Sequence, residues 1–213
     1  MFRKQYLSQN RKKTDILILA ESGAKDARDE HAWSGDWKKA HNSYWASGPE
    51  TKKKGHTGTG MSIHLGNTIP IKDDTLLYAD QKGRSIIVKL KMYNKDTIII
   101  GLHTDTHSAA EHTNSILRLE RALSNTNISP GTTIILATDL NNFFIPSLDH
   151  HNNNGKPSEH HAFPEGREAF SRIISKLHLV DTFRTMFPNK KEYTHKNSTI
   201  SKSRIDYIFI SEI

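Results

Sequence analysis

The sequence contains no cysteine among its 213 residues. This absence excludes disulfide bonds, zinc sites built on thiolates and catalysis by a thiol nucleophile. No long hydrophobic run is present and no secretory signal opens the chain, so we expect no contact with a membrane. The GxxxxGK[ST] pattern is absent as well, which excludes a P-loop nucleotide site in the glycine-containing stretch Lys52–Gly60.

Basic residues outnumber acidic ones, with 30 Lys and Arg against 23 Asp and Glu and a formal net charge of +7. Such a balance favours a polyanionic partner, although many basic proteins bind none. The 13 histidines are scattered. The pairs His150-His151 and His160-His161 lie in a polar, Asn-rich stretch, which indicates biased composition rather than a metal cage; a chance surface site for a transition metal stays open.

The strongest functional signal lies in Thr132–Phe144, which reads TTIILATDLNNFF. Its apolar, β-branched first half predicts a buried strand over Thr132–Ala137. Asp139 and Asn141 follow two residues apart, so in an extended chain their side chains point to the same face. A carboxylate and a carboxamide at a strand's carboxyl end suit Mg²⁺ and a phosphate. The alternative is that both residues simply form the turn that ends the strand.

Polar residues also stand at one end of three other predicted strands. Glu21 follows the apolar run Asp15–Ala20, although taken alone it is better explained as the start of the next turn or helix. His103 opens a polar cluster at the end of the run Asp96–His103. Asp206 directly precedes a closing strand, Tyr207–Ile210. The sequence therefore predicts several strand ends that carry groups able to bind or polarise a ligand.

The remaining pattern is rich in strands and poor in helices, so neighbouring strands should often be antiparallel. Further strands are predicted at His41–Ser47, Met61–Leu65, Leu76–Ala79 and Arg84–Met92. Helices are predicted at Ser108–Ser124 with Ser108 as N-cap, at Glu168–Leu177, and as shorter segments within Met1–Lys13, Gly23–Lys39 and Leu179–Phe187. Ile145–Gly166 is predicted to be a long loop. No repeat or linker divides the chain, which predicts a single domain over residues 1–213.

Taken in order, these motifs resemble the endonuclease/exonuclease/phosphatase superfamily, the fold of DNase I and the apurinic/apyrimidinic endonucleases. They are most similar to the endonuclease domains of LINE-type retroelements. DILILAES resembles the family's strand that ends in a metal-binding Glu, ATDLN resembles its GDFN, and SRIDYIFIS resembles its SRID segment. The stretch from Leu179 to His195 resembles the family's L-x-D-x-x-R…P…YT pattern. Each motif is weak alone, but four in the family's order cover nearly the whole chain.

The resemblance implies an α/β fold, a four-layer α/β/β/α sandwich (DNase I-like). It implies that Glu21 binds Mg²⁺, with Mn²⁺ as an alternative, and that Asp139 orients or deprotonates the attacking water. Asn141 would donate to a phosphoryl oxygen, and Asp206 matches the acid that orients the family's catalytic His. His103 stands where the family usually has a Tyr and would give a comparable hydrogen bond.

The sequence also departs from the family pattern. The family's first strand, which holds an Asn, and its last strand, which holds a Ser-Asp-His triplet, have no counterpart in residues 1–213. Thr138 replaces the Gly before the family's Asp. We therefore expect a partial domain that lacks the first and last strands, or a decayed copy.

These observations predict a Mg²⁺-dependent phosphodiester hydrolase, specifically a retroelement-type endonuclease domain that acts on DNA. Lys52, Lys53, Lys54 and Arg84 are predicted to contact its phosphates. The alternatives are an inactive remnant that binds nucleic acid, a small-molecule or lipid-headgroup phosphatase of the same superfamily, and an α/β protein whose strand-end acids are turn residues. The expected location is intracellular: nuclear for a retroelement endonuclease and otherwise cytoplasmic.

Overall fold

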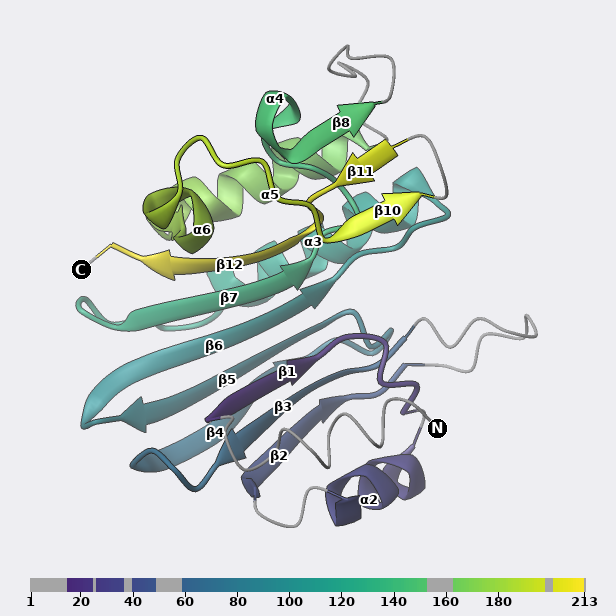
Figure 1. The fold of residues 1–213 in the computed structure, drawn as a ribbon. Helices are drawn as coiled ribbons and strands as arrows, with labels where there is room; N and C mark the ends of the chain where they lie inside the picture. Colours follow the sequence, from purple (N-terminus) through teal and green to yellow (C-terminus); the bar gives the residue numbers. More distant parts are fainter. Residues whose placement is uncertain are drawn as a thin grey trace. The chain divides into compact units, whose positions relative to one another are not determined.

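The computed structural model describes residues 15–24, 26–36, 40–48, 59–152, 163–197 and 201–212 (Figure 1). The chain divides into two compact units, one of residues 1–101 and 128–132 and the other of residues 102–127 and 133–213. Strand β6 (Lys95–His103) begins in the first unit and ends in the second. The helical segment predicted within Met1–Lys13 and the three lysines at 52–54 lie outside the described residues.

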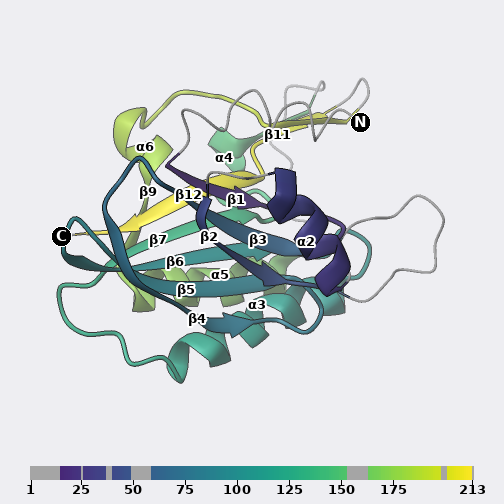
Figure 2. The same ribbon diagram turned by 90° about the horizontal axis from the view of Figure 1, so that it is seen from below.

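The first unit contains two groups of strands and helix α2 (Ala27–Asp36) (Figure 2). One sheet has the order β1-β3-β2, with both pairings antiparallel. The other group runs β4-β5-β6, with β4 and β5 antiparallel. The bounds of these strands are β1 (Ile16–Leu19), β2 (Ala40–Ala46), β3 (Met61–Gly66), β4 (Ile71–Ala79) and β5 (Ser85–Met92).

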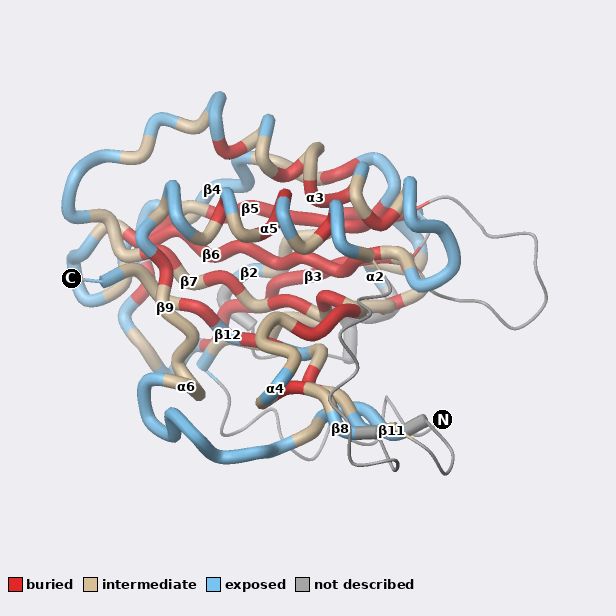
Figure 3. The backbone as a smooth tube through the Cα atoms, turned by 90° about the horizontal axis from the view of Figure 1, so that it is seen from above, coloured by how far each residue is buried: buried red, intermediate tan, exposed pale blue. Residues whose placement is uncertain are grey.

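The two groups of strands pack face to face within this unit. Apolar residues two apart on β3 and β5 supply most of the shared core, namely Met61, Ile63, Leu65, Ile86, Val88 and Leu90. Figure 3 shows the buried residues running along these strands. Gly101 in β6 allows the close approach, because a Cβ there would lie 2.7 Å from Met61 Cε. The strand predicted at Arg84–Met92 is confirmed as β5, although Ile87 is buried as well as Ile86 and Val88, so the first half of the strand is covered on both faces.

Two predictions for the first unit need correction. The apolar run Asp15–Ala20, expected to form a buried strand, is only half-buried, because β1 lies at the edge of its sheet and pairs, among the described residues, with β3. Strand β4 begins at Ile71, five residues before the predicted Leu76. Charged residues at positions 72–74 conceal this strand in the sequence, and the pairing with β5 is irregular between Lys72 and Thr75.

The second unit combines β7 (Thr133–Asp139), β12 (Asp206–Ser211) and β9 (Leu179–Asp181) in the sheet order β7-β12-β9. Both pairings are antiparallel. Helices α3 (Ala109–Ser124) and α5 (Pro164–Lys176) contact each other through exposed polar pairs such as Arg172 with Glu120. A smaller sheet has the order β10-β11-β8. The remaining elements are α4 (Pro146–Asp149), β8 (His150–Asn152), α6 (Thr182–Met186), β10 (His195–Asn197) and β11 (Ser201–Ser203).

Aromatic rings form much of the second unit's core. Phe170 of α5 packs edge-on against Phe209 of β12 with ring centroids 5.5 Å apart. Phe144 lies 5.9 Å from Phe209 in a similar arrangement. β7 alternates between buried and half-buried residues, so the fully buried strand predicted at Thr132–Ala137 is instead buried on one face. Period-two alternation is what a strand with two different faces requires.

The helix predicted at Ser108–Ser124 is confirmed, and its cap is present because the Ser108 hydroxyl accepts a hydrogen bond from the Glu111 N–H at 3.2 Å. The loop predicted at Ile145–Gly166 is wrong in part. It contains α4 and β8, and α5 begins inside it. Pro146 and Pro164 each start a helix, a position where the missing N–H of proline costs nothing.

Candidate functional site

The ends of β7 and β12 place two predicted site residues directly opposite each other. Asp206 is the register partner of Asp139 in the antiparallel pairing, which sets their Cα atoms about 4.5–5.5 Å apart. The side chain of Asp139 is 26% exposed, and Asp206 is exposed. Like charges directly opposite each other destabilise a sheet. A cation bound between the two carboxylates would relieve this repulsion.

His103, at the end of β6, brings an imidazole to the same carboxylate. Its Nε2 lies 3.9 Å from Asp139 Oδ2, and the residue is 1% exposed. The following residue continues the contact, since the Thr104 N–H donates to the Asp139 backbone carbonyl at 3.1 Å. Within the second unit the structure therefore brings His103, Asp139 and Asp206 together.

Asn141 completes this group in a left-handed backbone conformation with a φ of +47°. Its N–H donates to Asp139 Oδ1 at 3.2 Å, and its side-chain Nδ2 donates to the Thr104 carbonyl at 3.0 Å. The carboxamide is therefore held in a defined orientation. A carboxamide nitrogen carries two N–H groups, so the bond to Thr104 uses one and leaves the second for another acceptor.

The Leu140 carbonyl, between the two site residues, is held from both sides. The Thr104 hydroxyl donates to it at 2.6 Å, and His112 Nε2 of α3 lies 2.9 Å away. All three residues are fully buried. Burial lowers the pKa of His112, although the bond to Leu140 and the charge of Asp105 act in the opposite direction. A neutral imidazole with its proton on Nε2 fits this arrangement.

Sequence reasoning missed both partners of the Leu140 carbonyl. Thr104 lies in the polar cluster after His103, which was the available signal. No sequence signal pointed to His112, because a histidine within a helical pattern does not reveal which distant group it contacts. Gly166 of α5 packs so closely on this ring that a Cβ there would lie 2.2 Å from His112 Nδ1. The turn at Asp139–Asn141 thus depends on Thr104 just after β6 and on residues from α3 and α5 that are distant in sequence.

Glu21 and Arg84 belong to the first unit. Glu21 follows β1 with a φ of +52°, a conformation that is uncommon for residues other than glycine and that occurs at functional sites. Arg84 is 9% exposed, and its backbone N–H donates to the Asp80 carboxylate at 3.2 Å. This low exposure is unfavourable to a phosphate contact through Arg84. The predicted roles of Glu21 and Arg84 stay predictions.

The donor atoms at the strand ends fit a hard cation. Mg²⁺ takes oxygen ligands, retains several waters and commonly uses only one or two carboxylates, which Asp139 and Asp206 could supply. Among the described residues, no three His, Cys, Asp or Glu side chains form a group that could hold a metal ion.

Within the same residues, no helix is long and apolar enough to cross a membrane.

No protein-family model and no curated protein sequence matches the chain. Solved structures do match it. AP endonuclease LMAP from Leishmania major is 19% identical with a TM-score of 0.63, over 99% of this chain and 75% of that one. D. rerio TDP2 humanized by 14 mutations is 12% identical with a TM-score of 0.59, over 98% and 73%. TDP2 from Caenorhabditis elegans is 12% identical with a TM-score of 0.56, over 100% and 59%.

Proposed function

We propose that this chain, which has the DNase I-like α/β fold, is part of a phosphodiesterase domain that hydrolyses nucleic acid with the help of a divalent metal ion. The supporting observation is the arrangement at the strand ends of the second unit. Asp139 lies opposite Asp206, 3.9 Å from His103 and hydrogen-bonded to the Asn141 N–H. Two of the similar structures are described as an AP endonuclease and a TDP2.

Hydrolysis of a phosphodiester requires a water in line with the leaving oxygen and stabilisation of charge on the phosphoryl oxygens. We assign the positioning of the attacking water to Asp139, because its Oδ1 accepts from the Asn141 N–H while its Oδ2 faces His103. The carboxylate is thereby oriented before substrate arrives. Asp139 then orients the attacking water or accepts its proton.

Neutral hydrogen-bond donors and a cation would stabilise the negative charge on the phosphate. Asn141 can donate its second side-chain N–H to a phosphoryl oxygen while the first holds Thr104. His103 is the proposed hydrogen-bond donor beside it, and Asp139 and Asp206 are the carboxylates that could hold the metal ion at these strand ends. Glu21 stays the metal ligand that the family resemblance implies. When bound, Mg²⁺ or Mn²⁺ polarises the phosphate and stabilises the leaving oxygen.

The substrate class follows from charge. A net charge of +7 favours a polyanion over a small phosphoester, which supports DNA over a lipid headgroup or a soluble phosphate. The finer proposal is a retroelement endonuclease domain with a nuclear site of action, and it rests on the SRID and ATDLN motifs. Flanking genomic sequence tests it: we expect an upstream strand with Asn, a downstream Ser-Asp-His triplet and then a reverse transcriptase.

Plasmid nicking in Mg²⁺ tests the activity itself. We expect the 213-residue chain to bind DNA with strong salt dependence and to nick barely above a buffer control. A version extended by the family's first and last strands should cleave. In that version Asp139→Ala should reduce the rate by about 100-fold or more, whereas Asp73→Ala should not, since Asp73 is an exposed carboxylate paired with Lys91 on another strand.

The outcomes separate the alternatives. Nicking that EDTA abolishes supports the proposal in either version, and strong nicking by the 213-residue chain would show that the extra strands are dispensable. DNA binding without cleavage by the extended version would favour the inactive remnant. Hydrolysis of small phosphoesters without DNA binding would favour the phosphatase.

A further inference from the structure

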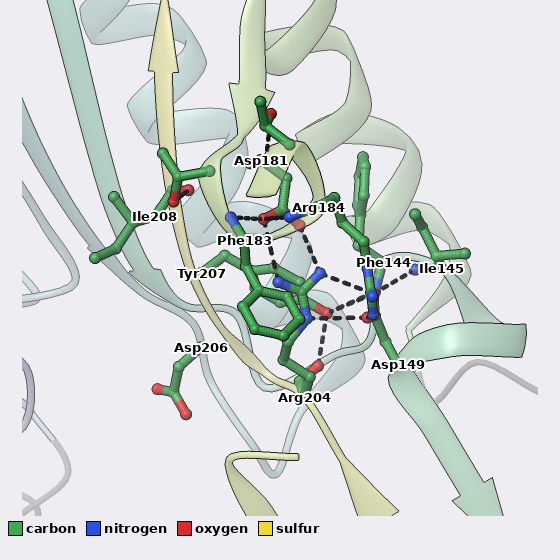
Figure 4. A network of polar contacts seen from close by, with 12 residues as sticks. Phe144, Ile145, Asp149, Asp181, Phe183, Arg184, Arg204, Asp206, Tyr207 and Ile208 are labelled. Carbon is green, nitrogen blue, oxygen red and sulfur yellow. Dashed lines mark hydrogen bonds and ion pairs between the residues drawn. The ribbon is translucent and has the colours of Figure 1, made fainter. Parts of the chain in front are cut away.

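A buried network of four charges lies beside the strand ends of the second unit (Figure 4). We call Arg204, Asp149, Asp181 and Arg184 the charge network. Asp149 is 0% and Arg204 is 3% exposed. Arg204 Nε donates to Asp149 Oδ1 at 2.9 Å, and its Nη1 donates to Asp181 Oδ1 at 3.2 Å. Arg184 pairs with Asp149, so two guanidinium groups balance two carboxylates.

The charge network joins three segments that are separate in the sequence. Asp149 ends α4 and also accepts a hydrogen bond from the Ile145 N–H at 2.9 Å. Asp181 caps α6 by accepting from the first N–H groups of that helix. The Arg204 guanidinium lies 4.4 Å from the ring centroid of Tyr207 and 5.1 Å from that of Phe183.

The same contacts reach the residues on both sides of Asp206. The Arg204 N–H donates to the Asp149 carbonyl at 2.8 Å. The Tyr207 hydroxyl donates to the Arg204 carbonyl at 2.6 Å and accepts from the Phe144 N–H at 2.8 Å. The start of β12 is thereby tied to the segment that follows Asn141. In Figure 4 the Asp206 side chain points away from the network, so the network holds its backbone and leaves its carboxylate exposed.

We propose that Arg204 is a positioning residue that holds Asp206 opposite Asp139 against the repulsion between their carboxylates. What the arrangement serves rests on the proposed function. Whether Arg204 holds Asp206 in place can be tested without measuring activity. Arginine is required because only a planar guanidinium can bind two carboxylates while it stacks on rings. A lysine would keep the charge and lose that geometry.

Burial alone would lower the pKa of Arg204, but its bonds to Asp181 and Asp149 raise it overall. The guanidinium is therefore positively charged in this network. The Asp149 carboxylate accepts hydrogen bonds from Arg204, Arg184 and the Ile145 N–H together. Loss of the Arg204 guanidinium should therefore loosen the start of β12 locally.

Amide hydrogen exchange of the metal-free and DNA-free chain tests the proposal. The reporters are the Leu140 N–H, which donates to the Ile205 carbonyl at 2.8 Å, and the Phe144 N–H, which donates to Tyr207. In Arg204→Lys we expect both to exchange about 10-fold faster or more, beyond any change in the middle of α3 and α5. The matched control is Arg172→Lys, because Arg172 also pairs with a carboxylate through two nitrogens but is exposed.

Faster exchange confined to the two reporters, with the control unchanged, supports the proposal. Exchange that rises equally in α3 and α5, or does not rise at the reporters, overturns it, since the network would then serve only global stability. If Arg204→Lys does not fold, Asp181→Asn replaces it: weakening this partner of Arg204 should accelerate the Leu140 N–H by about 5-fold, and an unchanged rate overturns the proposal.

A Mg²⁺ titration followed by NMR separates this inference from the proposed function. We expect the Asp139 and Asp206 signals of the wild type to respond, and Arg204→Lys to need on the order of 10-fold more Mg²⁺. A response with the same midpoint in both proteins would overturn the positioning role. A wild type that does not respond would contradict the proposed function, and the exchange rates, which need no metal, would still decide the role of Arg204.

Discussion

Two buried polar side chains in this protein, His64 and Arg204, differ in whether they carry a charge. In the first unit, His64 of β3 is 2% exposed and lies between two hydroxyls, with Ser43 Oγ 2.8 Å from Nδ1 and Ser62 Oγ 3.0 Å from Nε2. In the second unit, Arg204 is equally buried but lies between Asp149 and Asp181. Burial lowers the pKa of His64 to about 4, whereas the two carboxylates raise the pKa of Arg204 above its usual value.

The difference shows what decides whether a buried group keeps its charge. Burial opposes the charged form in both places. Neutral hydroxyls can satisfy an imidazole's hydrogen bonds without compensating a positive charge, so His64 is neutral. Carboxylates supply the opposite charge, so Arg204 stays ionised. The two groups should therefore respond differently to the loss of a partner and to acid.

The largest expected effect comes from removing a carboxylate of the charge network. Asp149→Asn leaves two buried guanidinium groups with one carboxylate, and breaking a buried pair in this way costs about 3–5 kcal/mol. Urea denaturation at pH 7 measures the change. The control is Asp73→Asn on the exposed pair with Lys91, which should stay within about 0.5 kcal/mol. A small change for Asp149→Asn would contradict the view that this network is a charged unit.

The next effect is a loss of stability in acid that depends on His64. Its folded pKa of about 4 lies below the unfolded value of 6.5, so the unfolded chain binds the proton more readily between these values. Stability is therefore complete above about pH 6.5 and falls toward pH 4, by about 3 kcal/mol from this group. Denaturation of the wild type and His64→Gln across this range tests it. The two stabilities should converge as pH falls, and parallel profiles would refute the prediction.

The smallest effect distinguishes the two hydroxyls beside His64. Ser62 is fully buried and Ser43 is half-buried. Ser62→Ala should cost about 1 kcal/mol, because the imidazole nitrogen it leaves has no water to replace the lost contact. Ser43→Ala should cost less, since water can reach that side. Equal losses in urea denaturation would argue that both nitrogens of His64 are equally accessible.

Local pattern predicted much of the fold. Period-two alternation located β3 and β5, and helical spacing after Ser108 located α3. The strand-end positions of Asp139, Asn141 and Asp206 were also visible, because a change from apolar to polar residues marks where a strand ends. These features depend on neighbours in the sequence, so a reader of the sequence can find them.

Long-range packing determined the rest. The half-burial of β1 follows from its place at a sheet edge, and the helices that begin at Pro146 and Pro164 stand where proline suggested a loop. Arg204 and Asp149 are 55 residues apart, and neither residue type reveals its partner. The pairing exists only because the second unit closes around it.

By itself the sequence determined which residues could do chemistry: the acids at the strand ends, the asparagine beside one of them and an excess of positive charge. Only the tertiary structure decided that Asp206 faces Asp139, that Thr104 and His112 hold the turn between Asp139 and Asn141, and that Arg204 is anchored beside them. The physical reason is that a strand or a turn is specified by local spacing. Register and buried ion pairs depend on which distant segments share one core.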